Sequence, residues 1–579
     1  MLETKIDQMV SLIRTKKKIS LYDLSKQLSW DEESVEKIAL ILEKSGYLKA
    51  HYPIDMIQKP WVGLNASAVV SKTVPSLGGK VLDSYTISEQ STNMKGDVKI
   101  MNIPSEKRAI YNIILPDVSV YVRAYLEHIK SEISKLMLSL PSPKDKSESE
   151  AILEKRKVLV SELINKDLSL DSGALRQLTD ILISEMYGLG KIEALIGDSK
   201  LEEIVINGHI SPVLVYHRQY GWLKTTIQMQ TDNEIRNYSE QIARKVGKQI
   251  STLNPILDAH ISTSDRANAT LYPISTCGNT ITLRLFARNP WTIIRFLKDD
   301  AHSLSYEMAA LLWQALHYEM NVLVAGGTAS GKTSLLNALL ALIPPFQRII
   351  TIEDTRELVL PSYQWNWVPM VTRAPNPEGL GEVTMLDLVV NSLRMRPDRI
   401  VMGEIRRKRE AEVLFEAMHT GHSVYGTLHA DTSSQVIKRL TQPPIEVSAS
   451  QVEDIHLLVI QYRDRRKNLR RTVDIAEVLP GLKKPELNHV YSWQSRTDTF
   501  NMIKPPHRYI EQMNLHTGMT ESEIRNDQKD KAAVLKWMVK NKLEGIDDVG
   551  KVMDLYYSDS ESLISAVKKD LSPSKVFGK

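Results

Sequence analysis

The feature that most constrains this chain is a glycine-bearing segment at residues 326–333, Gly326-Gly327-Thr328-Ala329-Ser330-Gly331-Lys332-Thr333. It has the spacing Gly, any four residues, Gly-Lys-Thr, and it lies between an apolar run at 322–325 and a helix-like run at 334–340. Glycines let backbone N–H groups approach phosphate oxygens, and the helix that follows directs the positive end of its dipole at them. A strand, this loop and a helix in that order predict a site for a nucleoside triphosphate.

The residue types in the loop predict separate roles in holding ATP and Mg²⁺. We expect Lys332 to reach the β and γ phosphates, and the Thr333 hydroxyl to bind the magnesium ion that accompanies ATP. The predicted nucleotide-binding residues are Gly326, Gly327, Thr328, Ala329, Ser330, Gly331, Lys332, Thr333 and Ser334.

The composition is that of a globular protein with several domains. The chain has 579 residues, of which 25% are charged. Its net charge of +4 is too small to indicate nucleic-acid binding by itself. The single cysteine, Cys277, cannot form an internal disulfide, and we interpret it as a small core residue in a reducing cytoplasm. The first residues do not resemble a signal peptide, and no run approaches the roughly 18 apolar residues of a membrane span. We therefore expect contact with a membrane only through a partner.

The first 64 residues are typical of a winged-helix-like domain. Three short amphipathic helices are predicted before Gly46, and the stretch 51–64 is suited to a β wing. Two functions stay open for this domain, DNA binding and protein docking. The third helix opens with the acidic run 31–33, which disfavours contact with phosphates and therefore favours protein docking.

The remaining chain divides by composition and periodicity. Short apolar strands at 321–325, 349–352, 400–402 and 423–428 alternate with helices, which predicts an α/β core with a mostly parallel sheet. The predicted parts are a small α+β element at 65–140, a polar linker at 141–150, an α+β domain at 151–288, a hinge linker at 289–303, the P-loop core at 304–480 and a helical C-terminal region at 481–579.

Three polar features follow the strands of the predicted core. Glu353-Asp354 ends one strand, Gly403-Glu404 ends the next, and His422 and His429 stand on either side of a third. Taken alone, a Glu-Asp pair is more often a turn or a helix cap, and a single His is more often structural. Their order after the phosphate loop favours a shared site, because parallel sheets hold ligands at the carboxyl ends of their strands.

These motifs resemble those of the type II/type IV secretion ATPase superfamily, the motors of secretion systems, type IV pili and the archaellum. The matching elements are the Walker A loop at 326–333, the Asp box at 353–354, the Walker B element ending at 403–404 and the His box at 420–430. The resemblance spans about residues 165 to 480. The amino-acid sequences of 393–399 and of the arginine-rich segment 463–471 are most similar to the archaeal branch.

The resemblance implies a RecA-like core and a role for each matching residue. Glu353 is implied to activate water, Glu404 to act on the magnesium side, and His422 and His429 to sense or position the γ-phosphate. Arg266, Arg284 and Arg288 match arginines of the preceding domain that neutralise transition-state charge, although an ordinary surface ion pair is the alternative for each. Arg406 is a candidate to face the site.

The resemblance also implies how the protein works and with what. The cofactors are ATP and Mg²⁺, and the expected assembly is a homohexamer, cytoplasmic and peripheral at the inner face of the cell membrane. It would drive an integral membrane platform protein, and indirectly pilin-like or archaellin-like subunits. Two other hypotheses are a nucleic-acid-associated P-loop ATPase that uses the winged-helix domain, and a non-hydrolysing assembly scaffold.

Overall fold

The computed structural model describes most of the chain and divides it into two compact units, Met1–Leu285 and Phe286–Lys579. The described residues are 2–52, 59–65, 78–88, 95–104, 106–136, 146–261, 265–286, 290–299, 301–373, 375, 379–464, 466–467, 469–481 and 484–578. The two units are called unit 1 and unit 2 below, and each is described by itself.

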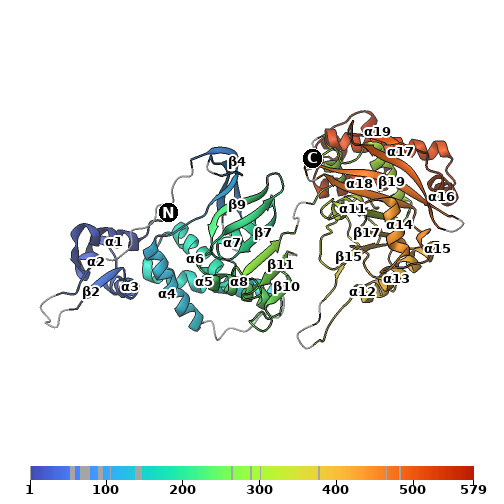
Figure 1. Cartoon of the computed structure of the whole chain (residues 1–579). Helices are drawn as coiled ribbons and strands as arrows, with labels where there is room; N and C mark the ends of the chain where they lie inside the picture. The colour runs from blue at the N-terminus through green and yellow to red at the C-terminus, as the bar shows by residue number, and fades with distance from the viewer. Residues whose placement is uncertain are drawn as a thin grey trace. The chain divides into compact units, whose positions relative to one another are not determined.

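Unit 1 begins with the winged-helix-like domain that the sequence predicts (Figure 1). Its sheet has the order β1-β3-β2, with antiparallel pairing throughout. The side chains of Ser20 and Asp31 accept hydrogen bonds from backbone N–H groups in the first turns of α2 and α3, and so cap both helices. The elements are α1 (Lys5–Lys16), β1 (Lys18–Ser20), α2 (Leu21–Leu28), α3 (Glu32–Lys44), β2 (Leu48–His51) and β3 (Trp61–Leu64).

Three long helices share one hydrophobic core with the winged helix. They are α4 (Val120–Leu136), α5 (Lys146–Leu168) and α6 (Ser172–Tyr187). Asp167 of α5 connects α4 and the winged helix, because its backbone carbonyl accepts from Trp30 Nε1 at 2.8 Å and its carboxylate accepts from Tyr125 at 3.0 Å. The sequence predicts a linker at 141–150, but α5 already begins at Lys146, so the predicted linker is too long.

A nine-stranded sheet forms the other part of unit 1, in the order β10-β11-β12-β7-β8-β9-β6-β5-β4. The prediction of a separate α+β element at 65–140 is wrong, because β6 pairs in parallel with β9 and brings β4 and β5 into the same sheet. The strands are β4 (Lys80–Ser88), β5 (Lys95–Asn102), β6 (Ile110–Ile114), β7 (Leu201–Asn207), β8 (Pro212–His217), β9 (Gly221–Gln228), β10 (Ile256–His260), β11 (Arg266–Thr270) and β12 (Thr280–Arg284), with helices α7 (Lys191–Ile196) and α8 (Asp232–Lys245).

Unit 2 is built on a second nine-stranded sheet, in the order β15-β14-β16-β17-β13-β18-β19-β20-β21. The first six strands are parallel, and the last three continue the sheet in antiparallel pairs. This confirms the predicted α/β core. The strands are β13 (Val322–Gly326), β14 (Ile349–Glu353), β15 (Trp367–Val371), β16 (Arg399–Met402), β17 (Ser423–Leu428), β18 (Leu457–Asp464), β19 (Leu469–Leu479), β20 (Glu486–Gln494) and β21 (Thr499–Met502).

Helices cover both faces of this sheet and bury its apolar side chains (Figure 1). One face packs against α9 (Ile293–Leu297), α10 (Tyr306–His317), α11 (Lys332–Leu340) and the C-terminal helices α16 (Arg508–Thr517), α17 (Glu521–Lys540), α18 (Ile546–Ser558), α19 (Ser560–Lys568) and α20 (Pro573–Phe577). The other face packs against α12 (Met385–Ser392), α13 (Lys408–His419), α14 (Ser433–Thr441) and α15 (Ala449–Val452).

Two further predicted boundaries need correction. Most of the hinge predicted at 289–303 belongs to unit 2, because α9 buries Ile293, Ile294, Phe296 and Leu297 in its core, while residues 287–289 and 300 lie outside the described residues. The C-terminal region predicted as helical from 481 first adds β20 and β21 to the sheet, and its helices begin at Arg508. Both segments alternate polar and apolar residues too irregularly for their period to be read from the sequence.

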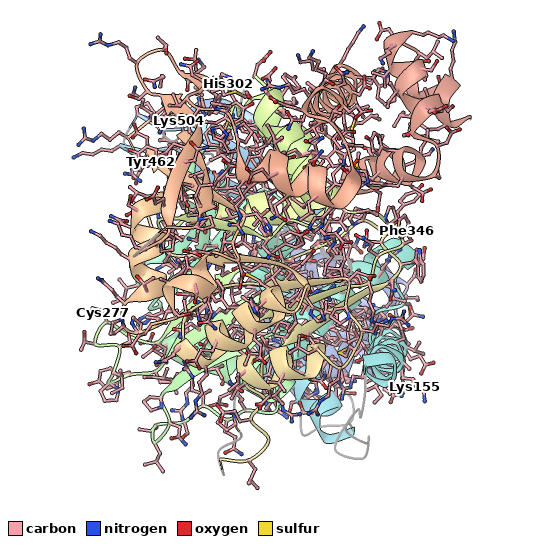
Figure 2. All side chains as sticks on the ribbon, turned by 90° about the vertical axis from the view of Figure 1, so that its right-hand side faces the viewer. Lys155, Cys277, His302, Phe346, Tyr462 and Lys504 are labelled. Atoms are coloured by element: carbon pink, nitrogen blue, oxygen red, sulfur yellow. The ribbon has the colours of Figure 1, made fainter. Side chains whose placement is uncertain are left out.

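Among the described residues, no helix is long and apolar enough to cross a bilayer. Cys277 is exposed (Figure 2) and is therefore not the core residue that we expected.

Candidate functional site

The phosphate loop connects β13 to α11 in a conformation that requires small residues. Gly331 precedes the first turn of α11 at φ +95°, and Ala329 is left-handed at φ +59°. A Cβ on Gly326 would lie 2.3 Å from the carbonyl oxygen of Gln461, which is backbone and cannot move aside cheaply. The loop is therefore held tightly at its first glycine and is exposed at Thr328 and Ala329.

Lys332 is buried at the start of α11 and points back into the loop. Its Nζ donates to the carbonyl oxygen of Gly327 at 3.0 Å and lies 3.4 Å from His429 Nδ1. Burial lowers the pKa of Lys332, and the nearby carboxylate of Glu404 opposes that shift. Thr333 and Ser334 follow in the first turn of α11, where Thr333 is half-buried and Ser334 is exposed.

The carboxyl ends of four parallel strands bring the predicted side chains together. Beyond the contact between Lys332 and His429, His429 Nε2 lies 3.5 Å from Glu404 Oε1. Arg406 then bridges two carboxylates, donating to Glu404 Oε2 at 2.8 Å and to Asp354 Oδ2 at 2.7 Å. A continuous row of contacts therefore runs from the loop lysine to the Asp box, and Arg406 faces the site.

Glu353 ends β14 and is 2% exposed. Its Oε1 accepts from the backbone N–H groups of Glu357 at 2.9 Å and Leu358 at 3.1 Å. Within the described part of the chain, its Oε2 has no hydrogen-bond partner. Burial raises the pKa of Glu353 to about 7, against the effect of the two backbone hydrogen bonds. The side chain lies beside the Walker B element, because a Cβ on Gly403 would be 3.2 Å from its Cγ.

The pKa values of Glu404 and His429 are lowered, whereas that of Glu353 is raised. Burial alone would raise the pKa of Glu404, but the hydrogen bond and charge of Arg406 outweigh it and lower that pKa. Burial and the charge of Lys332 lower the pKa of His429, which favours a neutral imidazole. Since the ammonium group of Lys332 faces Nδ1, we assign the imidazole proton to Nε2, where it faces Glu404.

His422 does not join this cluster within the chain. It precedes β17 and His429 follows it, so the two imidazoles stand at opposite ends of the strand, roughly 20 Å apart for six residues at about 3.3 Å each. The nearest polar contact of His422 is Thr420 Oγ1, at 3.3 Å from Nδ1. The strand separates the two histidines within one chain, and the role predicted for His422, to sense or position the γ-phosphate, stays a prediction.

The predicted arginines of unit 1 lie next to each other. Arg266 and Arg284 are directly opposite in the antiparallel pair of β11 and β12, so both point to one face of the sheet. Arg266 pairs with Asp258, with Nη2 to Oδ2 at 2.7 Å, and both arginines are exposed. Arg288 lies outside the described residues. What Arg266 and Arg284 contribute to the nucleotide site stays a prediction.

Three residues that the sequence did not assign to the site contact its parts. The carboxylate of Asp431 lies 2.8 Å from where a Cβ on Gly327 would be. Asn337 of α11 accepts the backbone N–H of Val359 at 2.8 Å, and so holds the segment that follows Glu353. Arg470 Nε donates to the carbonyl oxygen of Ala329 at 3.3 Å. Only Asp431, two residues after His429, stood close enough to a motif to be found from the sequence.

The loop and its neighbours fit a bound nucleoside triphosphate with magnesium. Within the described residues, the Ser330 hydroxyl is buried in the loop without a hydrogen-bond partner, as is Glu353 Oε2 nearby in the cluster. An ammonium group, a threonine hydroxyl and an ionised carboxylate stand at the same edge of the sheet, and these are the donors that a magnesium-nucleotide complex requires.

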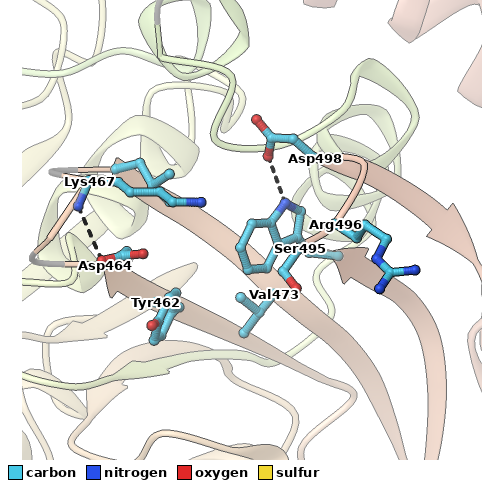
Figure 3. A pocket seen from close by; sticks show the side chains of 9 residues that line it. Tyr462, Asp464, Lys467, Val473, Ser495, Arg496 and Asp498 are labelled. Atoms are coloured by element: carbon cyan, nitrogen blue, oxygen red, sulfur yellow. Dashed lines mark hydrogen bonds between the residues drawn. The ribbon is translucent and has the colours of Figure 1, made fainter.

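A separate cavity of about 660 Å³ lies on the antiparallel strands of unit 2 (Figure 3). Tyr462 and Trp493 form an aromatic part of its wall, with ring centroids 6.2 Å apart. Trp493 Nε1 donates to Asp498 Oδ1 at 2.8 Å, and Tyr462 is also exposed at the surface (Figures 2 and 3). Among the described residues, the lining of this cavity includes none of the predicted nucleotide-binding residues.

The parallel sheet, the phosphate loop and the carboxylates at the strand ends define a P-loop nucleotide-binding protein with a RecA-like core. One strand, β17, separates the phosphate-loop strand β13 from the Walker B strand β16. Each of these strands ends at a side chain of the cluster or at the loop itself.

Comparison with known proteins identifies the family. The family described as "Type II/IV secretion system protein" matches residues 188–466. An uncharacterized protein of Methanocaldococcus jannaschii is 37% identical over 356 residues, which are 59% of this chain and 46% of that protein. A second uncharacterized protein of the same organism is 32% identical, over 65% of this chain and 69% of that protein. The type IV secretion system protein VirB11 of Bartonella quintana is 31% identical, over 44% of this chain and 79% of VirB11.

The chain belongs to the type II/type IV secretion system ATPase superfamily. The two Methanocaldococcus jannaschii relatives named above fit the archaeal branch. The match spans less than half the length of the first of these relatives.

Proposed function

We propose that this protein is an ATP-hydrolysing motor that powers assembly of a type IV pilus-like filament, or of a type II-like secretion system or archaellum, through a membrane platform protein. The observation that carries the proposal is the convergence of Lys332, His429 and Glu404 at one edge of the sheet, with Glu353 beside them. Its reaction is the transfer of the γ-phosphoryl group of ATP to water, which gives ADP and phosphate.

The roles of the side chains follow from their charges. Lys332 binds the β and γ phosphates, and the neutral imidazole of His429 positions the γ-phosphate beside it. Glu353 accepts a proton from the attacking water at Oε2, because Oε1 is held by backbone N–H groups and the pKa of about 7 suits a base near neutral pH. Phosphoryl transfer needs mainly positioning and charge stabilisation, which this arrangement supplies.

The chain's residues also fit the cofactor. Thr333 would bind magnesium directly and Glu404 through water, and the ion would neutralise charge on the phosphates when it is bound. Arg406 keeps Glu404 ionised for this purpose and holds it against the Asp box. The role of Arg266 and Arg284 is to approach the nucleotide from unit 1 and neutralise transition-state charge.

We propose the assembly and location that the family resemblance implies. The motor acts as a homohexamer, in the cytoplasm and peripheral to the inner face of the cell membrane. Force passes to an integral membrane platform protein and through it to pilin-like or archaellin-like subunits. The similarity to VirB11, a type IV secretion system protein, supports this class of task.

ATP turnover by the purified chain tests the proposal. We expect Lys332→Ala and Glu353→Ala each to lower the rate by at least about tenfold. The matched controls are Lys529→Ala and Glu511→Ala, which change exposed residues of α17 and α16. Unchanged turnover in both site variants would show that the site is assigned to the wrong residues.

Nucleic-acid handling is the alternative function. The exposed residues Asp31, Glu32 and Glu33 at the start of α3 disfavour it, because they would face the phosphates of a duplex. Salt-dependent binding of a duplex DNA at micromolar concentration, lost on deletion of residues 1–64, would favour the alternative instead.

A further inference from the structure

Arg470 is a residue of β19 that lies along the phosphate loop. Its Nε donates to the carbonyl oxygen of Ala329 at 3.3 Å. Its Cδ lies 3.6 Å from the position that a Cβ on Gly331 would occupy, so the aliphatic stem follows the same side of the loop. One side chain therefore lies along the loop at Ala329 and Gly331, just before Lys332.

The backbone of both loop residues is left-handed. Ala329 has φ +59° and Gly331 has φ +95°. Alanine does not favour this region, because its Cβ approaches the backbone carbonyl too closely. Thr328 and Ala329 are also exposed, so packing of their own side chains does little to fix the loop. The contact from Arg470 restrains the part of the loop that is intrinsically least stable.

We propose that Arg470 is a positioning residue that holds the phosphate loop in its nucleotide-binding conformation. The inference rests on the proposed function, because it takes the loop as the nucleotide site. Arg470 does not contact the reacting atoms in this account. It acts through the backbone of Ala329 and Gly331, and so lowers the cost of ordering the loop around phosphate.

Arg471 fixes the position of Arg470. It is buried, and its guanidinium forms two hydrogen bonds with Asp498, at 2.7 and 2.6 Å. The hydrogen bond from Arg471 holds the pKa of Asp498 well below its ordinary value. The same guanidinium donates to the carbonyl oxygen of Arg470 at 2.8 Å, and Asp498 (Figure 3) in turn accepts a hydrogen bond from Trp493 Nε1 at 2.8 Å.

A segment at the start of unit 2 is tied to the same point. Ser303 Oγ donates to the carbonyl oxygen of Arg470 at 3.1 Å, and the Thr472 N–H donates to the carbonyl oxygen of Ser303 at 2.7 Å. Arg471 also donates to the carbonyl oxygen of Ala301 at 2.8 Å. Residues 301–303 are therefore connected to the phosphate loop through two consecutive arginines, so a displacement of this segment would reach the loop.

Nucleotide affinity tests the proposal directly. We expect Arg470→Ala to raise the Kd for a magnesium complex of a non-hydrolysable ATP analogue by about tenfold, measured by calorimetry. The turnover number at saturating ATP should change by less than about threefold, because the chemistry is not altered once the loop is occupied. Arg470→Lys should raise the Kd by about threefold, since it keeps a charge and a stem but not the Nε donor.

Arg466→Ala, in the exposed turn of the same hairpin, should leave Kd unchanged. Thermal unfolding without nucleotide verifies that Arg470→Ala is folded, and Arg470→Lys carries the test if it is not. An unchanged Kd in Arg470→Ala, or a loss confined to the turnover number, would overturn the proposal. Binding needs no hydrolysis, so a wild-type chain that binds but does not hydrolyse would contradict the proposed function alone.

Discussion

The two glutamates of the site have opposite electrostatic surroundings. Glu353 is buried, with one oxygen held by backbone N–H groups, and its pKa is raised to about 7 by burial. Glu404 is bonded to Arg406, which keeps its pKa below the ordinary value despite burial. Carboxyl groups whose pKa values are separated in this way can serve as a proton acceptor and a permanent anion in one site.

The raised pKa of Glu353 predicts how turnover depends on pH. Only the ionised carboxylate can accept a proton from water, so the turnover number should rise as pH rises through about 7 and fall about tenfold for each unit below it. The measurement is a turnover profile at saturating ATP. Glu353→Gln should lose this dependence along with most of the activity, whereas Glu511→Ala should keep the wild-type profile. A wild-type profile that is flat through pH 7 would mean that Glu353 is not the base.

At the scale of the element, the sequence predicts the strands but not which strands lie next to one another in the sheet. Apolar runs before Glu353, Glu404 and His429 predict the strands correctly. β14 ends at Glu353, β16 ends two residues before Glu404, and β17 ends one residue before His429. Sheet order is not encoded locally, so nothing marked Arg470 of β19 or Asn337 of α11 as parts of the site. His422 and His429 stand on either side of β17, as the sequence predicts, and the strand therefore separates the two imidazoles.

Asn337 offers a test of how α11 supports the catalytic segment. Its amide oxygen accepts the Val359 N–H at 2.8 Å, and the side chain is buried. Asn337→Ala should leave that N–H without its acceptor and lower the free energy of unfolding by about 1–3 kcal/mol. Turnover should also fall, because the segment from Glu353 to Val359 loses an anchor. Urea unfolding measures the first effect.

The control for this change is Asn391→Ala, at an exposed position of α12, which should alter stability by less than about 0.5 kcal/mol. Equal stability of the Asn337 and Asn391 variants would show that the segment after Glu353 does not depend on α11.

At the scale of the whole molecule, the C-terminal helices are part of the ATPase unit. Lys531 is buried and bonded to Asp527 and to Tyr556, at 2.9 Å, while Trp313 of α10 donates to Tyr557 at 2.9 Å. A buried ammonium group has to be paired in this way, so α17 and α18 are fixed to the face that also carries α10 and α11. The sequence left their role open because polar residues such as Lys531 interrupt the apolar pattern.

Arg284 allows a test of whether unit 1 takes part in hydrolysis. Arg266 and Arg284 are cross-strand neighbours on an exposed face of unit 1, whereas Lys332 and Glu353 belong to unit 2. If Arg284 neutralises transition-state charge, Arg284→Ala should lower the turnover number by at least about tenfold, with a smaller change in nucleotide Kd. Arg236→Ala, which removes an exposed helical ion pair of the same unit, is the matched control and should leave both quantities unchanged.

Mixing variants then distinguishes the source of the arginine. Subunits with Arg284→Ala keep an intact phosphate loop, and subunits with Lys332→Ala keep the arginine. If the arginine comes from a neighbouring subunit, a mixed assembly contains some complete sites, and its rate should exceed that of either variant alone. If it comes from the same chain, every site lacks one component and mixing should restore nothing. Full turnover by Arg284→Ala itself would exclude this arginine from the reaction.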